Sequence, residues 1–215
     1  FGRSDRPPLT YSASLYTTFV RDFLTDLTTD ATVVASSLTA AYVAEAARDV
    51  DVSRLVLVCP TTDTIPGRRV WLRSLIRAPV VGQAVFNAIG SKPSIRYFHD
   101  DHGYYDLANL DAETVDYEWE TAHQPGARFA PASFISGHLD PDLDLAEVLG
   151  DLGVPVTLVW GSESDLPPLS AGRDLAAAAD VELVSIGGSA LLPHVEHPAE
   201  FLRVVRGEAE YVDAR

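Results

Sequence analysis

Two adjacent serines stand between a short apolar run and an Ala-rich segment, and they are the residues best placed for nucleophilic chemistry. Residues 32–35 (TVVA) predict a buried strand, and residues 38–48 (LTAAYVAEAAR) predict a helix. Ser37 would then occupy the tight turn between them, where the helix dipole and free N–H groups favour developing negative charge. A serine in this position can attack a carbonyl carbon, with the N–H of Leu38 as one oxyanion donor.

The turn itself, residues 35–39 (ASSLT), also admits a purely structural interpretation. The usual pattern for such a nucleophile is G-x-S-x-G, whereas here Ala35 and Thr39 take the two glycine positions. Ala35 is still small, but the β-branched Thr39 is expected to crowd the contact between helix and strand. The alternative is that Ser36 or Ser37 acts only as the N-cap of the helix, so the surrounding elements have to decide.

The elements that would position this serine alternate along the chain. An apolar stripe of Leu15, Phe19, Phe23 and Leu27 predicts a helix over residues 11–27. Further strands are predicted at 54–59, 155–160 and 181–186, and further helices at 170–179 and 198–206. Short strands that alternate with helices predict an α/β fold, a mostly parallel sheet flanked by helices.

The middle of the chain has a different character. Residues 64–150 contain no convincing strand, and their helical stretches are interrupted by glycine and proline. This predicts a helical insertion that divides the chain into core residues 1–63, insertion 64–150 and core residues 151–215. The aromatic side chains of the insertion are expected to form its own core, and some could line an apolar pocket over Ser37. They are Trp71, Phe86, Tyr97, Phe98, Tyr104 and Tyr105.

The order of several motifs resembles the α/β-hydrolase-fold family over almost the whole chain. The motifs are GRSDRPP, ASSLTAA, RLVLVCP, PVTLVWGSESD and LLPHVEHPAEF. The insertion, including residues 122–139, resembles the helical cap of esterases and dehalogenase-like members. The resemblance implies a serine hydrolase that acts on an ester or similar acyl bond of a small apolar substrate, without a cofactor. A haloalkane-type dehalogenase is disfavoured, because it needs an aspartate nucleophile where this chain has Ser37.

The resemblance also implies the position of the catalytic acid, a few residues beyond the pair Trp160-Gly161. Asp165 is the expected acid, and Glu163 is an alternative because the usual spacing is one residue shorter. Asp63 is a second alternative, at a position that some dehalogenase-like members use. A carboxylate is needed there because it fixes the tautomer of the histidine base and stabilises the imidazolium.

The base is the weakest part of the predicted triad. The family motif runs roughly G-H-x-P-H-x-E-x-P, and alignment on its prolines puts Leu191 in the position of the catalytic histidine. Leucine cannot accept a proton from Ser37, so His194 is the remaining candidate base, while His197 is expected at the surface. The second hypothesis is therefore a catalytically impaired member that binds a small apolar ligand or a protein partner under its cap.

Family members begin with further strands and a His-Gly-type oxyanion loop, for which there is no counterpart after Phe1. We therefore expect the sheet to lack its N-terminal strands and to have an exposed edge, unless a separate segment completes it. The site would then also lack one of its oxyanion donors.

Composition narrows the function classes. The 215 residues carry 31 acidic and 16 basic side chains, a net charge of −15, and Lys92 is the one lysine. Such a charge repels nucleic acids and anionic membranes, and it predicts salt adaptation, although an ordinary acidic enzyme is the alternative.

No apolar run is long enough to span a membrane. Cys59 is the one cysteine, expected as a buried thiol, so a cytoplasmic location is predicted. The oligomeric state is left open.

Histidines in the insertion raise the question of a metal. His99 and His102 flank two aspartates, and His123 and His138 follow later. A metal needs ligands that converge from several segments, and the spacing indicates no such set. Neither a metal nor a cofactor is predicted.

Overall fold

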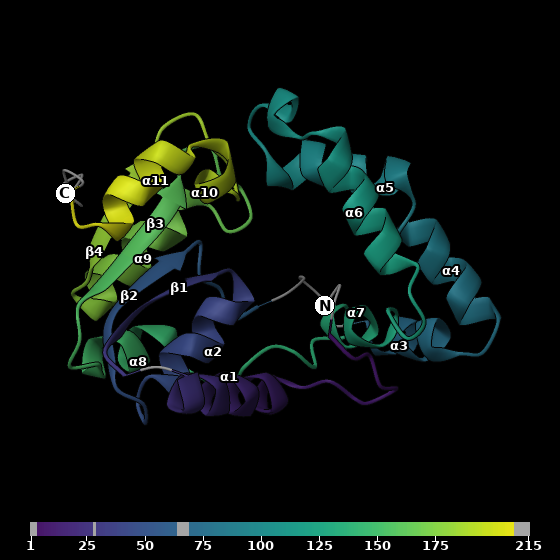
Figure 1. Ribbon diagram of the computed structural model, residues 1–215, viewed down its shortest axis with the longest axis horizontal. Helices are drawn as coiled ribbons and strands as arrows, with labels where there is room; N and C mark the ends of the chain where they lie inside the picture. Colours follow the sequence, from purple (N-terminus) through teal and green to yellow (C-terminus); the bar gives the residue numbers. More distant parts are fainter. Residues whose placement is uncertain (1–3, 28, 64–68, 209–215) are drawn as a thin grey trace.

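The fold is an α/β sandwich built on one parallel sheet (Figure 1). The computed structural model describes residues 4–27, 29–63 and 69–208. The strands are β1 (Ala31–Ser36), β2 (Val52–Val58), β3 (Val156–Gly161) and β4 (Glu182–Ile186), and they follow the spatial order β1-β2-β3-β4. All three neighbouring pairs are parallel, so the predicted fold class is confirmed.

The two central strands form the middle of the core. Leu55, Leu57 and Leu158 are fully buried, because parallel strands covered on both faces place every side chain in the interior. Cys59 directly follows β2 and is also fully buried. Burial raises the pKa of its thiol to about 11, so the thiol stays protonated at neutral pH. The predicted buried structural cysteine is confirmed.

Helices cover both faces of the sheet. On one face the ring of Trp160 packs against Gly172 of α9 (Leu169–Ala179). Thr157 points to the opposite face, because side chains alternate along a strand. There its hydroxyl accepts a bond from Arg54, which also donates to carbonyls of α11 (Pro198–Val205). The chain reaches α11 through the short helix α10 (Pro193–Glu196).

Two helices flank the first strand. α1 (Ala13–Leu27) packs on α2 (Leu38–Ala46), and Leu24 is its buried anchor. The expected apolar stripe faces solvent instead, since Phe19 is 65% and Phe23 is 52% exposed. The side chain of Leu27, the last stripe position, lies outside the described residues. β1 lies at one end of the described sheet.

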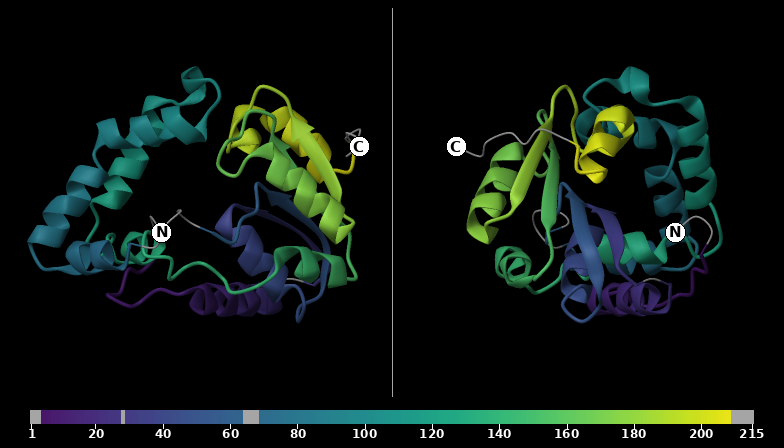
Figure 2. Two further views of the ribbon diagram at one scale, coloured as in Figure 1. Left: turned by 180° about the vertical axis from the view of Figure 1, so that it is seen from behind. Right: turned by 60° about the vertical axis from the view of Figure 1, so that its left-hand side comes forward.

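A helical lobe lies beside the sheet (Figure 2). It contains α3 (Val70–Arg77), α4 (Val81–Ile89), α5 (Lys92–Phe98), the π-helix η1 (His99–Gly103), the 3-10 helix η2 (Leu107–Asn109), α6 (Ala112–Ala122) and α7 (Phe129–Phe134). Residues 69–139, which we call the helical lobe, contain no strand. None of the helices in the described part of the chain is long and apolar enough to cross a membrane.

The predicted three-part division of the chain stays a prediction. Its first boundary, at residue 64, falls outside the described residues. Near its second boundary, α8 (Leu145–Asp151) belongs by packing to the sheet, because its Leu145, Val148 and Leu149 join the same core cluster as the strands. The helical lobe therefore ends before α8.

The aromatic side chains of the lobe only partly follow the prediction that they form its core. Phe86 and Tyr104 are buried, as expected. The other four are at least 50% exposed, so the prediction is wrong for Trp71, Tyr97, Phe98 and Tyr105. The lobe helices pack around small apolar clusters, which leave room for few large side chains inside.

Candidate active site

Ser37 occupies a strained turn between β1 and α2. Its backbone has φ 55° and ψ −133°, a combination that residues with a side chain rarely adopt. Its N–H donates to the carbonyl oxygen of Val58 at 2.8 Å, which ties the turn to the end of β2. A sharp strand-to-helix turn of this kind presents a serine hydroxyl at the carboxyl edge of the sheet.

The N-cap interpretation does not fit this turn. A capping serine has extended backbone angles and accepts a bond from an N–H of the first helical turn, whereas the hydroxyl of Ser37 makes no capping bond. Leu38 begins α2, so its N–H is among those that the helix itself leaves unpaired. The crowding expected at Thr39 is not found, because that side chain is exposed while Ala35 is buried.

The loop after β3 lies directly beside the loop after β4. A side chain at Gly161 would collide with the carbonyl oxygens of Ser189 and Ala190, so only glycine permits this approach. The N–H of Glu163 donates to Ser189 at 2.9 Å, and the hydroxyl of Ser162 accepts from the N–H of Gly188 at 3.0 Å. The loop that carries the predicted acid is thus bonded to the loop that leads into α10, the helix of the predicted base.

Asp165 makes its contact with a histidine from the helical lobe. Its Oδ1 lies 3.4 Å from Nδ1 of His102, while Nε2 of His102 lies 3.3 Å from Oδ2 of Asp101. Asp165 is well exposed. Sequence reasoning missed this pairing, since it considered His102 only as a metal ligand and no local pattern relates residues in two different lobes.

His194 lies on α10 with its ring against Phe201, at 5.7 Å between ring centroids. Burial lowers the pKa of His194, which favours the neutral imidazole that can accept a proton. Its Nδ1 is buried without a hydrogen-bond partner in the described part of the chain. Among the described residues no hydrogen bond joins His194 to Ser37 or to Asp165.

The remaining candidates are more peripheral. Glu163 is exposed and accepts a bond from the hydroxyl of Ser162 at 3.1 Å. Asp63 is exposed in a turn closed by Thr61. His197, which was expected at the surface, is half-buried, and its Nε2 donates to the carbonyl oxygen of Gly188 at 3.0 Å.

Comparison with known proteins identifies the family of this chain. The profile described as "Alpha/beta hydrolase family" matches residues 1–204. The chain belongs to the alpha/beta hydrolase family. A search of curated proteins gives no match.

Solved structures agree with the fold of this alpha/beta hydrolase. MGS-M2, an alpha/beta hydrolase enzyme from a Medee basin deep-sea metagenome library, is 18% identical with a TM-score of 0.70; the match covers 98% of this chain and 77% of that one. A meta-cleavage product hydrolase from Pseudomonas fluorescens is 20% identical over 96% and 75% of the two chains, with a TM-score of 0.70. The esterase EaEST from Exiguobacterium antarcticum is 13% identical over 96% and 77%, with a TM-score of 0.69.

Leu191 of this alpha/beta hydrolase packs against the main core cluster. Its side chain therefore has a packing role in the loop that precedes α10. Metal ligands do not converge elsewhere in the described residues, where no group of three or more candidate ligands is found. His99 is instead buried against the carboxylate of Glu118, at 3.0 Å from Nε2.

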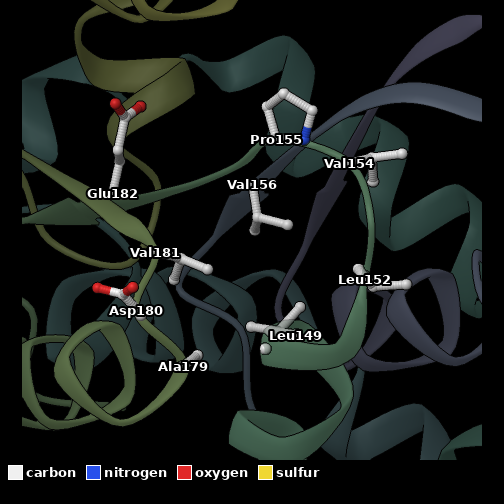
Figure 3. Close-up of a pocket in the computed structure, with 10 residues that line it drawn as sticks. Leu149, Leu152, Val154, Pro155, Val156, Ala179, Asp180, Val181 and Glu182 are labelled. Atoms are coloured by element: carbon white, nitrogen blue, oxygen red, sulfur yellow. The ribbon is translucent and has the colours of Figure 1, made fainter.

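A cavity of about 300 Å³ lies at the start of β3 and β4 (Figure 3). Val156 and Glu182, the first residues of β3 and β4, line it together with Leu149 of α8. It therefore opens at the amino ends of the strands, whereas Ser37 lies beyond a carboxyl end. Ligands of open parallel sheets bind at the carboxyl ends, so this cavity is not a candidate active site.

Proposed function

We propose that this alpha/beta hydrolase cleaves an ester or a similar acyl bond by nucleophilic attack of Ser37. The observation that carries the proposal is the backbone of Ser37, which has a positive φ between a buried strand and a helix. Strained backbone of this kind clusters at functional sites, and the hydroxyl of Ser37 makes no capping bond that would explain the strain. The N–H of Leu38 would hold the oxyanion of the tetrahedral intermediate.

His194 is proposed as the base that takes the proton of Ser37. A partly buried imidazole with a lowered pKa is mostly neutral at pH 7, which is the form that a base needs. Asp165 is proposed to orient this base. For that, its carboxylate has to leave His102 and turn toward α10, a change that an exposed side chain makes at little cost.

The proposed substrate is small, uncharged and apolar. The net charge of −15 disfavours anionic substrates, because it repels them from the whole surface. Structural neighbours include proteins described as an esterase, an epoxide hydrolase and a meta-cleavage product hydrolase. The exposed aromatic side chains of the lobe, such as Trp71 and Phe98, offer apolar contacts to such a substrate.

The test compares two adjacent serines. The rate of p-nitrophenyl acetate hydrolysis is measured in high salt for the full chain, for Ser37→Ala and for Ser36→Ala. We expect Ser37→Ala to lower the rate by about 10³-fold or more, and Ser36→Ala to leave it within a few-fold of the original. Equal rates for the original chain and Ser37→Ala would contradict the proposal.

A second candidate function is binding of a small apolar ligand without catalysis. Two observations favour it: Leu191 fills the position that the family motif gives to a histidine, and His194 has no described bond to Asp165. Leu191→His is the variant that discriminates. If the original chain is inactive and Leu191→His hydrolyses the ester, the chain is an impaired family member.

A further inference from the structure

Glu196, the last residue of α10, is a buried carboxylate that is not used in the proposed reaction. It is 8% exposed, and its two oxygens accept three backbone N–H bonds. Oε1 accepts from Tyr105 at 3.0 Å and from Asp106 at 3.1 Å, and Oε2 accepts from Ala190 at 2.9 Å. The described residues form no ion pair with it, so these N–H dipoles compensate its buried charge.

The three donors belong to two different parts of the molecule. Tyr105 and Asp106 follow η1 and belong to the helical lobe. Ala190 belongs to the loop between β4 and α10, one residue before Leu191. The side chain of Glu196 therefore joins three parts of the molecule: the helical lobe, the loop that carries Leu191, and the helix α10 that carries His194.

Other contacts surround this junction but do not fix its register. Leu192 packs against a lobe cluster that contains Tyr104, Leu110 and Val115, and apolar packing of this kind is not directional. The contact between Asp165 and His102 is long and exposed, so it contributes little. Charge-assisted bonds are both short and directional, so those of Glu196 define how this end of the lobe lies against α10. At the other end of the lobe, Arg77 donates to the carbonyl oxygen of Leu9 and Tyr42 donates to that of Leu139.

We propose that Glu196 is a positioning residue that holds the helical lobe in register with the loop carrying Leu191 and with His194. Its effect on catalysis rests on the proposed function, whereas its effect on the junction does not. Through the lobe it sets the shape of the space over Ser37, and through α10 it sets the position of the proposed base.

Glu196→Gln is the informative substitution. The amide keeps the volume of the carboxylate, but its nitrogen can only donate a hydrogen bond. The nitrogen must therefore face either the N–H groups of Tyr105 and Asp106 or that of Ala190, and two donors cannot bond to each other. The variant therefore loses the bonds to the lobe or the bond to Ala190. Glu200→Gln is the matched control, because it makes the same chemical change on an exposed position of α11.

The first experiment measures amide hydrogen exchange at Tyr105, Asp106 and Ala190. In Glu196→Gln we expect exchange to be at least about tenfold faster at the lobe pair or at Ala190, and unchanged in Glu200→Gln. Glu196→Asp, which keeps the charge but is too short to reach all three donors, gives the same result if Glu196→Gln fails to fold. Unchanged exchange at all three amides in a folded variant overturns the proposal.

The second experiment separates positioning from simple loss of folded enzyme. KM and kcat are measured for the original chain, for Glu196→Gln and for Glu200→Gln, each with p-nitrophenyl acetate and p-nitrophenyl hexanoate. A displaced lobe raises KM for the longer ester by about tenfold relative to the shorter one, whereas loss of folded enzyme lowers kcat equally for both. An unchanged ratio between the esters overturns the positioning role. If the original chain hydrolyses neither ester, the proposed function fails, and the exchange experiment still decides the role of Glu196 at the junction.

Discussion

At the scale of single residues, the backbone of Ser37 is the feature that most needs an explanation. Holding a residue with a side chain at φ 55° costs about 1–3 kcal/mol, which the surrounding structure has to offset. The bond from its N–H to Val58 and the start of α2 supply that support. The strain is therefore maintained by elements on both sides of the turn.

His194 gives a prediction about pH. Its pKa is lowered from 6.5 by burial, so the imidazole stays neutral, and able to accept a proton, below pH 6.5. The acid limb of kcat/KM should consequently lie below pH 6.5, with activity lost only as the pH falls through the lowered pKa. The position of the limb is checked by measuring kcat/KM from about pH 4 to about pH 9, a range that covers both protonation states of a histidine.

The matched control for this prediction is His197, which is half-buried on the neighbouring turn. His194→Gln should remove the acid limb together with most of the activity, about 10³-fold, whereas His197→Gln should keep both within a few-fold. Full activity of His194→Gln would remove His194 from the mechanism.

The position of a single residue could be predicted from the sequence only where the signal was local. Ser37 could be placed on a strand-to-helix turn because a buried strand, a tight turn and a helix follow one another within a few positions. The pairing of Asp165 with His102 could not, because it joins the loop after β3 to a helical lobe whose placement depends on the whole fold. The three N–H partners of Glu196 are invisible in sequence for the same reason.

At the scale of elements, periodicity located the strands but not their surroundings. The second strand was predicted at 54–59 and is found at Val52–Val58, a difference within the usual uncertainty of element ends. Exposure was harder to predict, since the apolar stripe of α1 and the lobe residue Trp71 both face solvent. An amphipathic pattern specifies an apolar face, while tertiary structure decides whether anything covers it.

The close approach of the loops after β3 and β4 gives an element-scale prediction. Gly161→Ala places a methyl group against the carbonyls of Ser189 and Ala190, and overpacking of this kind costs about 1–3 kcal/mol. Gly153→Ala is the control, because no atom lies within 4 Å of its added methyl group. Urea unfolding in high salt measures both free energies of unfolding. Equal stability of the two variants would show that the loops are not in contact as described.

At the scale of the whole molecule, the main electrostatic feature is the mutual repulsion of the excess acidic side chains. The net charge is −15, and described ion pairs such as Arg21–Asp49 and Lys92–Asp116 are largely exposed, so they compensate little of it. Salt reduces the Debye length from about 10 Å at 0.1 M to about 3 Å at 1 M. Most of the repulsion between surface carboxylates should disappear over that range.

We therefore expect the urea midpoint of unfolding to rise between about 0.1 M and 1 M NaCl at neutral pH. The same series near the isoelectric point of about 4.6 is the control, because there is little net charge left to screen. A midpoint that is flat or falls with salt at neutral pH would exclude salt adaptation.

The most direct test of the account is the site of covalent labelling by a fluorophosphonate, which reacts with an activated serine and releases fluoride. Trypsin cleavage after Arg21 and Arg48 gives the fragment 22–48, which contains both Ser36 and Ser37. We expect one label per folded chain, assigned by fragmentation mass spectrometry to Ser37. A folded chain that takes up no label, or that carries it on any other residue, would contradict the claim that Ser37 is the nucleophile.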